Sequence, residues 1–300
     1  RARRTSAAAG VRLAAERRRR GGSAAVSEQV ADVGCMALAV PSLDEVLYEP
    51  QRRIVGAHLA TGFGFLNASQ VGTGKTCATA RASRAKAREL PDLRVLLICQ
   101  SELREQWREE LAEKFFPEAA LIAAEPPRIA NQLARFERET GERPGVVIAS
   151  YEQARMYTDE LGALTYDEIV VDEAARLANP NTQLSRALWK LRKRAAVGIG
   201  LTGTPFGKSL GELDSIIAFC REDERALRER PLERHFGGFD SLTRKRLMEA
   251  MGPVVQRVTR AEMRRYMPEV GEIETVKLTP GDAHAALLER IETGIAEIYA

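Results

Sequence analysis

The sequence predicts an α/β fold, a doubly wound and mostly parallel sheet. Two observations lead to this prediction. Short continuous apolar runs, typical of strands buried on both faces, alternate along the chain with stretches of helical spacing. A glycine-containing phosphate-binding pattern follows the first of these runs. Ligands of such sheets bind outside the carboxyl ends of the strands, so we expect the functional residues at that edge.

The chain begins with a basic segment. Residues 1–20 hold eight Arg and one acidic residue, Glu16, for a net charge of +7, so the formal total of +3 leaves −4 for the rest. Arg, Ala and Gly bury too little apolar surface to fold alone. We expect residues 1–41 to be a basic, disordered extension that is either simply solvated or in non-specific contact with nucleic acid.

A helix is expected after residue 42, because Pro50 suits a first turn and Ile54, His58 and Leu59 then share one face. His58 is expected to be packed or at the surface rather than a ligand. The amide of Gln51 carries both a donor and an acceptor, so it could read an adenine edge. A solvated surface glutamine is the alternative.

The phosphate loop, residues 69–76 (SQVGTGKT), lies between the apolar run 62–68 and a helical pattern that starts at Cys77. Glycine tolerates the backbone conformations that let several N–H groups converge on phosphates at a helix N-terminus. Lys75 would reach the β and γ phosphates of a nucleotide, and the Thr76 hydroxyl would bind Mg²⁺. The residues expected to bind the nucleotide here are Gly72, Thr73, Gly74, Lys75 and Thr76. The alternative is a chance Gly-Lys-Thr on a turn, since the general pattern has Gly where Ser69 stands.

After the phosphate loop, expected strands and expected helices alternate regularly along the chain. Strands are expected at residues 93–99, 120–124, 145–150, 168–172 and 196–202, and helices at 101–115, 128–140, 151–161 and 181–194. The four cysteines show no metal-ligand spacing and are expected to be reduced thiols of an intracellular protein. No apolar run is long enough for a membrane span.

An acid pair, Asp172 and Glu173, ends the expected strand 168–172. A carboxylate at this place is suited to hold Mg²⁺ partly through water, so we assign Asp172 to the metal and Glu173 to orienting or deprotonating the attacking water. A surface pair that caps the next helix is the alternative.

The threonine turn, residues 201–205 (LTGTP), follows the next strand, and the hydroxyls of Thr202 and Thr204 flank Gly203 beside the expected γ-phosphate. An ordinary turn is the alternative there.

The order of five segments resembles the first ATPase lobe of the Swi/Snf-type translocases, within the superfamily-two helicases. They are SQVGTGKT, CQSELREQW, ASYEQAR, YDEIVVDEAARLAN and LTGTPFGKSLGELDSIIAF. The resemblance covers about residues 42–280 and implies a RecA-like lobe that uses ATP and Mg²⁺. By this resemblance Gln51 reads adenine, Lys75 with the acid pair is catalytic, and Thr202, Gly203 and Thr204 couple hydrolysis to motion.

The same resemblance implies sequence-independent binding to double-stranded DNA. It places Ser101, Gln106 and Trp107 in the segment after the second strand, and Ser150 and Tyr151 at the start of a motif that approaches a DNA strand. Trp107 by itself is typical of a core residue. DEAD-box RNA helicases have Ser-Ala-Thr where this chain has Thr-Gly-Thr, so duplex DNA is favoured and an RNA helicase lobe is the alternative.

Three positions depart from the family pattern. Ser69 stands where an acidic residue is usual, Ala175 where a His is usual, and Lys208 where an Asn is usual. The missing His would link the acid pair to the threonine turn. Its absence puts the coupling of ATP hydrolysis to motion in question but does not affect metal binding. A catalytically silent ATP-binding or DNA-tethering module is therefore the alternative function.

The expected domain division has the lobe at residues 42–220 and a helical, basic appendage at 221–300 that includes a strand-like run at 272–279. Residues 256–270 (QRVTRAEMRRYMPEV) resemble the family's basic segment before a Leu-Pro turn. The chain opens on Arg1 and stops within a helical pattern, so we expect a fragment whose second RecA-like lobe lies elsewhere in a longer protein.

Overall fold

The structure is a computed structural model that describes residues 47–141, 143–205, 207–236, 246, 249, 251–252 and 254–267. The described residues up to Tyr266 belong to one compact unit, and Met267 belongs to a second. The expected basic extension, the strand-like run 272–279 and the last helix lie outside the described residues. No described helix is both long enough and apolar enough to cross a bilayer.

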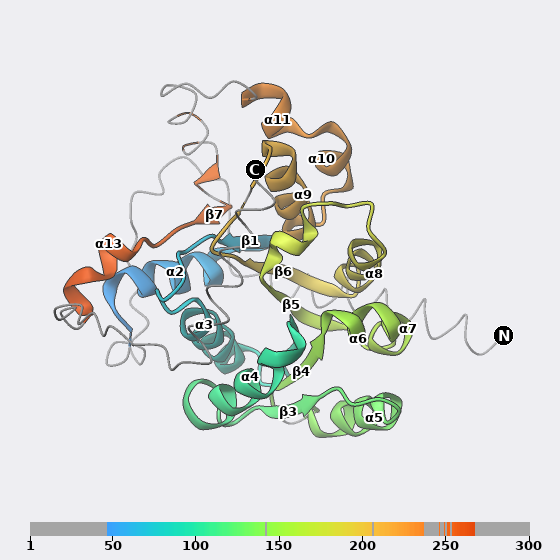
Figure 1. Cartoon of the computed structure of the whole chain (residues 1–300). Helices are drawn as coiled ribbons and strands as arrows, with labels where there is room; N and C mark the ends of the chain where they lie inside the picture. The colour runs from blue at the N-terminus through green and yellow to red at the C-terminus, as the bar shows by residue number, and fades with distance from the viewer. Residues whose placement is uncertain are drawn as a thin grey trace, which may run out of the picture. The chain divides into compact units, whose positions relative to one another are not determined.

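Within the described residues a sheet of seven strands forms the centre of the first unit (Figure 1). The strands are β1 (Gly64–Asn67), β2 (Arg94–Cys99), β3 (Ala120–Ala123), β4 (Gly145–Ser150), β5 (Tyr166–Asp172), β6 (Ala195–Leu201) and β7 (Val255–Gln256). Their order is β3-β4-β2-β5-β6-β1-β7, and every pairing is parallel. The α/β fold expected from the sequence is confirmed, and the six strands expected before residue 203 all form.

Helices cover both faces of the sheet (Figure 1). One hydrophobic cluster joins the strands to α2 (Glu49–Ala60), α3 (Lys75–Glu89) and α4 (Arg104–Glu110). The other joins them to α5 (Ile129–Glu139), α6 (Tyr151–Met156), α7 (Thr158–Leu161), α8 (Gln183–Arg192) and α9 (Leu210–Arg221). Alternate strand residues enter opposite clusters, as with Leu96 and Leu97 of β2, which explains why the strands read as continuous apolar runs.

Two expected helices are interrupted. Residues 101–115 form a 3₁₀ turn (Ser101–Leu103), then α4, then a π-helical turn (Leu111–Phe115). Residues 151–161 divide into α6 and α7 at Tyr157.

Three of the four cysteines, Cys77, Cys99 and Cys220, are described, and all three are free thiols as expected.

The strand β7 was missed in the sequence because it is only two residues long. It pairs with β1 through Leu66 and Val255 and through Asn67 and Gln256. Before it come α10 (Glu224–Glu229) and α11 (Pro231–Phe236), and after it come α13 (Arg260–Met263) and a 3₁₀ turn (Arg264–Tyr266). Part of the expected appendage therefore extends the sheet of the lobe.

A buried arginine joins α8 to α9 and to the amino-terminal ends of β1 and β6. Arg192 is 1% exposed, and its guanidinium donates to the main-chain oxygens of Phe63, Ala195, Phe219 and Cys220 at 2.7–3.1 Å. It also pairs with Glu222 at 3.3 Å. Four carbonyls from three segments thus share one side chain, which holds α9 against the ends of β1 and β6.

A second buried polar network holds α2 and α3 against β5. Glu168 of β5 is fully buried and accepts hydrogen bonds from Ser83 at 2.6 Å and from Lys86 at 3.2 Å. His58 of α2 lies 3.0 Å from the same carboxylate, so the expected packed histidine is confirmed. Burial by itself would raise the pKa of Glu168, but Lys86, His58 and Ser83 together hold it well below its usual range.

Candidate functional site

The phosphate loop joins β1 to the N-terminus of α3. Gly72 and Gly74 both have φ of +82°, the left-handed region that favours glycine. Gly74 caps α3, and a Cβ there would lie 2.3 Å from Nε2 of Gln51. Backbone N–H groups at such a helix start are available to an anion. The loop therefore has the backbone that the sequence predicts for phosphate binding.

Lys75 begins α3, and its side chain folds onto its own loop. The ammonium donates to the main-chain oxygens of Ser69 at 3.0 Å and Gln70 at 3.2 Å. Burial lowers the pKa of Lys75, while the nearby charges of Asp172 and Glu173 act in the opposite direction. A phosphate ligand would compete with the two carbonyls for this ammonium and would offer it a full negative charge.

The acid pair lies at the carboxyl end of β5. The Asp172 carboxylate accepts a hydrogen bond from the Trp107 indole at 2.9 Å, and the Tyr151 hydroxyl donates to the main-chain oxygens of both Asp172 and Glu173. Glu173 has φ of +58°, an uncommon value for a residue other than glycine. Backbone conformations of this kind cost free energy and cluster at functional sites.

The threonine turn contacts the acid pair directly. The hydroxyl of Thr202 donates to the Glu173 carboxylate at 2.9 Å, and the Thr204 N–H donates to the same hydroxyl at 3.1 Å. Because β5, β6 and β1 are adjacent, their carboxyl ends bring the acid pair, the threonine turn and the phosphate loop together. The sequence placed these three segments at the same edge, and the structure brings them into one cluster.

Charge is poorly compensated within this cluster. Burial raises the pKa of Asp172, although the hydrogen bond from Trp107 opposes the rise, and the charge of Glu173 adds to it. At the same time burial lowers the pKa of Lys75. A cation beside Asp172 and an anion beside Lys75 would each relieve these costs.

The donor set of the site fits Mg²⁺. Thr76 and Asp172 are half-buried and offer a hydroxyl and a carboxylate, the hard oxygen ligands that this ion takes. Across the described ranges no group of three or more His, Cys, Asp or Glu could hold a metal. Mg²⁺ is commonly held by one or two protein groups together with waters and substrate phosphates, so a small protein donor set suits it.

Gln51 lies beside the phosphate loop and is buried. Its Nε2 donates to the Thr73 carbonyl at 3.1 Å, and its Oε1 accepts from the Tyr48 N–H at 3.0 Å. Each end of the amide keeps one further hydrogen-bonding position, so contact with an adenine edge stays a prediction. Thr73 is buried as well, and its hydroxyl donates to the Gln70 carbonyl at 2.7 Å.

The four residues proposed for DNA contact fall into two kinds. Ser101, in the 3₁₀ turn before α4, and Gln106, in α4, are exposed, and their side chains bond to Glu102 and Glu110 respectively. Ser150 and Tyr151 are buried, because the Ser150 side chain caps α6 and the Tyr151 hydroxyl bonds to the acid pair. A role of these residues toward DNA stays a prediction, and for Ser150 and Tyr151 it would act through the positions of other groups.

The contribution of Trp107 to the site was missed in the sequence, which indicated only a core residue. Trp107 is 4% exposed and packs in the core, and its indole N–H also donates the hydrogen bond to Asp172. A buried indole N–H usually finds an acceptor, and the helix that bears Trp107 starts at the same sheet edge as the acid pair. This preference of buried indoles for an acceptor is the signal that could have indicated the bond between Trp107 and Asp172.

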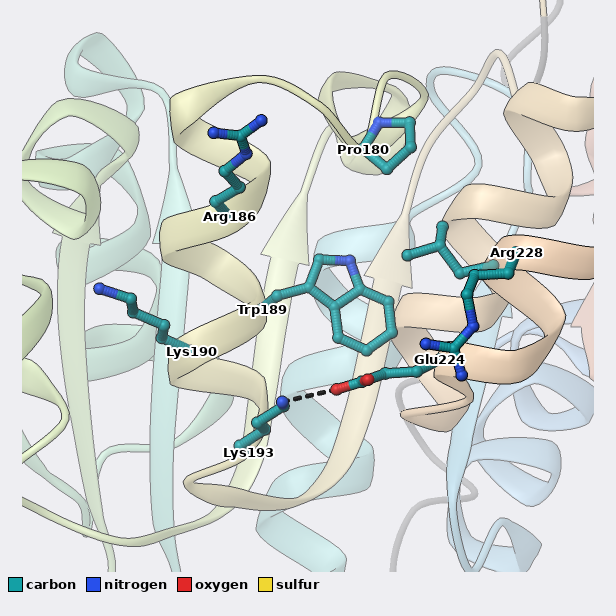
Figure 2. A pocket seen from close by; sticks show the side chains of 8 residues that line it. Pro180, Arg186, Trp189, Lys190, Lys193, Glu224 and Arg228 are labelled. Carbon is teal, nitrogen blue, oxygen red and sulfur yellow. Dashed lines mark ion pairs between the residues drawn. The ribbon is translucent and has the colours of Figure 1, made fainter.

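A cavity of about 290 Å³ lies elsewhere, between α8 and α10 (Figure 2). It is lined by Pro180, Arg186, Trp189, Lys190, Lys193, Glu224, Leu227 and Arg228. Lys193 and Glu224 form an ion pair of 2.5 Å across it. The cavity shares no residue with the phosphate loop, the acid pair or the threonine turn, so it is not part of the cluster described above.

The comparison with protein families decides the assignment. A sequence profile of the SNF2-related domain matches residues 17–286. The chain belongs to this family. The SNF2-related domain is an ATPase domain of the helicase and translocase class, and the matched range includes the phosphate loop, the acid pair and the threonine turn.

Two curated relatives show how this SNF2-related domain compares with longer proteins. Chromodomain-helicase-DNA-binding protein 1-like of Mus musculus is 26% identical over 221 residues, which are 70% of this chain and 23% of that protein. The putative ATP-dependent helicase/translocase YwqA of Bacillus subtilis (strain 168) is 31% identical over 166 residues, 54% of this chain and 17% of that protein. The chain thus spans less than a quarter of the length of either relative.

A solved structure shares the fold of this SNF2-related domain. The Sulfolobus solfataricus SWI2/SNF2 ATPase core in complex with dsDNA matches with a TM-score of 0.56 and 24% identity. The match covers 71% of this chain and 44% of the other. At this identity the likeness concerns the fold.

Proposed function

We propose that this SNF2-related domain is the first lobe of an ATP-dependent translocase that moves along double-stranded DNA without sequence preference. One observation carries the proposal. The hydrogen bond from Thr202 to Glu173 joins the threonine turn to the acid pair, beside a phosphate loop whose lysine is only half-exposed. A nucleotide at this place would contact all three segments at once.

Each residue of the cluster has a role in this proposal. Lys75 exchanges its two loop carbonyls for the β and γ phosphates, and Gln51 holds the adenine. Thr76 and Asp172 would hold Mg²⁺, which when bound neutralises developing charge on the phosphates. Glu173 orients the attacking water or accepts its proton, and the Thr202 hydroxyl fixes the carboxylate that does so.

The departure at Ala175 bears on the alternative function, a silent ATP-binding or DNA-tethering module. The family's histidine would link the acid pair to the threonine turn, and here Thr202 makes a direct link to Glu173. The direct bond supports a competent site. Ser69 is likewise accommodated, because its hydroxyl accepts the Val258 N–H at 3.0 Å.

The activity is proposed for the longer protein that would carry the family's second lobe. Phosphoryl transfer requires positive charge on the γ-phosphate oxygens, and an arginine supplied across a cleft is worth about 10³ to 10⁵ in rate. The 300-residue chain should therefore bind Mg-ATP weakly and hydrolyse it very slowly. Addition of the rest of the gene product in cis should restore turnover by orders of magnitude.

The deciding experiment is ATPase activity of the full-length gene product with double-stranded DNA, single-stranded RNA or no nucleic acid. Stimulation by duplex DNA of any sequence, lost in Lys75→Ala, supports the proposal. Stimulation by RNA alone would indicate the RNA helicase lobe. ATP binding without turnover under any condition would identify the silent module. Robust DNA-stimulated turnover by the 300-residue chain as a monomer would show that the second lobe is not needed.

DNA binding by the lobe itself needs a separate measurement, because the eight arginines of residues 1–20 would attract polyanions by their charge alone. We expect the affinity to fall steeply with salt, since Lys and Arg contacts to phosphates release counterions. The comparison is between residues 1–300 and a shortened chain that starts near Ser42. A shortened chain whose DNA affinity is the same at low and moderate salt would argue against backbone binding by the lobe.

A further inference from the structure

The segment after β7 lies against the phosphate loop. We call residues 257–266 the strap. Gln70 donates its N–H to the Val258 carbonyl at 2.9 Å, and the Val258 N–H donates to the Ser69 hydroxyl at 3.0 Å. Arg260 then bonds twice to the loop, through its N–H to Oε1 of Gln70 at 2.6 Å and through Nε to the Val71 carbonyl at 3.0 Å. Three consecutive loop residues are thus tied to the strap.

The rest of the strap lies against the start of α2. The Arg53 guanidinium donates to the Arg257 carbonyl at 3.1 Å and pairs with Glu262 at 2.7 Å. The rings of Tyr48 and Tyr266 stack with centroids 4.6 Å apart. Because α2 bears Gln51, the strap contacts both elements to which the proposed nucleotide site belongs.

Val71 is where the strap and the threonine turn meet. Its carbonyl accepts the bond from Arg260, and a Cβ on Gly203 would lie 3.1 Å from Cγ2 of Val71 and 3.8 Å from Nζ of Lys75. The loop residue next to the left-handed Gly72 is therefore held on one side by an arginine and approached on the other by the turn. A shift of Val71 would alter contacts on both sides.

We propose that Arg260 is a positioning residue for the phosphate loop, and that the strap and bound nucleotide stabilise each other. The inference rests on the proposed function, because it assumes that ATP binds this loop. A loop with two glycines at positive φ has alternatives to the phosphate-binding conformation, and the bonds of Arg260 select one of them. If the strap favours the binding conformation, ATP must favour the docked strap by the same factor.

The geometry distinguishes this role from direct contact with the γ-phosphate. The Nε of Arg260 bonds to the loop's own main chain, and the residue lies at the start of α13. A residue that fixes the loop changes the affinity for ATP. A residue that stabilises the transition state changes the rate constant of the bound complex instead.

The first test measures Mg-ATP affinity of the 300-residue chain by calorimetry. Loss of a typical intramolecular hydrogen bond weakens binding by a modest factor, so Arg260→Ala should raise Kd about threefold to tenfold. Arg264→Ala is the matched control, because it removes the same charge from an exposed residue of the strap, and its Kd should equal that of the parent. Arg260→Lys should lie between the parent and Arg260→Ala.

The outcomes separate the inference from the proposed function. A parent chain that does not bind Mg-ATP overturns both. A parent that binds, with Arg260→Ala equal to it, overturns the inference alone. In the full-length protein, Arg260→Ala should raise KM for ATP and leave kcat within about twofold of the parent. A fall in kcat at unchanged KM would contradict a positioning role.

The second test follows amide hydrogen exchange of the strap. A variant that changed the ATP affinity of the loop without involving the strap would leave this exchange unaltered. Mg-ATP should slow exchange of residues 257–266 in the parent, and Arg260→Ala should lose most of that protection. Ser69→Ala should speed exchange of the Val258 amide, whose acceptor it removes. Strap exchange that is the same with and without saturating Mg-ATP would overturn the mutual stabilisation.

Discussion

The hydroxyl of Thr202 donates a 2.9 Å hydrogen bond to the carboxylate of Glu173, across the two adjacent strands β6 and β5. Thr202 is fully buried, and its own N–H donates to the Asn67 carbonyl of β1. The side chain proposed to orient the attacking water is thus held by a residue whose backbone is bonded to the strand that carries the phosphate loop.

Replacing Thr202 by the isosteric Val should lower ATP turnover of the full-length protein about tenfold to hundredfold, because a hydrogen bond to a charged group is lost. ATP affinity should change by less than about threefold, since the substitution touches no phosphate contact. Steady-state kinetics give both quantities. Thr202→Ser is the comparison, because it keeps the hydroxyl that bonds to Glu173, and equal losses in the two variants would contradict the assignment.

Lys75→Ala and Glu173→Gln should separate binding from chemistry. Without the ammonium, phosphate charge is left uncompensated in a partly dehydrated site, so Lys75→Ala should abolish measurable ATP binding. Glu173→Gln keeps the shape and the bond to Thr202 but loses the base, so it should bind ATP and retain it unhydrolysed. Calorimetry and a single-turnover assay check the pair. Parent-like ATP affinity of Lys75→Ala would show that the phosphate-loop assignment is wrong.

Trp107→Phe removes the N–H that Asp172 accepts and keeps most of the ring. The half-buried carboxylate then loses the hydrogen bond of the indole, so the free energy of unfolding should fall by about 1–3 kcal/mol. More Mg²⁺ should also be needed to reach half-maximal ATP binding. Trp189→Phe is the matched control, because the Trp189 indole N–H bonds to none of the residues that the structure describes. Urea unfolding and a Mg²⁺ titration measure the two effects, and equal results for both tryptophans would count against the hydrogen bond.

The sequence was sufficient for most of the fold and for the cluster, because strand periodicity and loop motifs are local signals. The positions of Lys75, Asp172, Glu173 and Thr202 at one edge follow from the parallel topology alone. The bonds among them do not follow, since the sequence says nothing about which side chains meet. The indole of Trp107 and the strap at Arg260 reach the site from 65 and 190 residues away along the chain from their partners Asp172 and Gln70.

The buried Glu168 should give a distinctive pH dependence of stability. Its pKa in the folded state lies below the ordinary 4.5, so the ionised form stabilises the fold above pH 4.5, and this contribution is lost as the pH falls through the lower folded pKa. Glu168→Gln should cost about 3 kcal/mol at pH 7. The difference between parent and variant should stay constant down to about pH 5 and shrink below it.

Urea unfolding between pH 3 and pH 7 measures this difference. Glu118→Gln is the control, because Glu118 pairs with Arg84 at the surface, at 2.7 Å, and should cost less than about 1 kcal/mol. A Glu168→Gln variant whose difference from the parent grows as the pH falls would have the wrong sign for a carboxylate with a lowered pKa.

Arg192→Met should be strongly destabilising, because four main-chain oxygens and Glu222 lose one shared donor group. We expect a loss of about 3–5 kcal/mol in the free energy of unfolding. Lys190→Met lies on the same helix, is exposed, and should change stability by less than about 0.5 kcal/mol. Thermal and urea unfolding of both variants check the prediction, and a loss below about 1 kcal/mol at Arg192 would refute it.

The strand order has a consequence for a chain that is still being synthesised. In the described sheet β1 pairs only with β6 and β7, which begin at residues 195 and 255. A nascent chain that ends before residue 195 therefore has β2, β3, β4 and β5 able to pair while β1, the strand before the phosphate loop, has no neighbour. Such non-local pairing is slow and leaves a strand edge open to other chains. We therefore expect a chain on the ribosome to bind nucleotide only after β6 has been synthesised and has paired between β5 and β1.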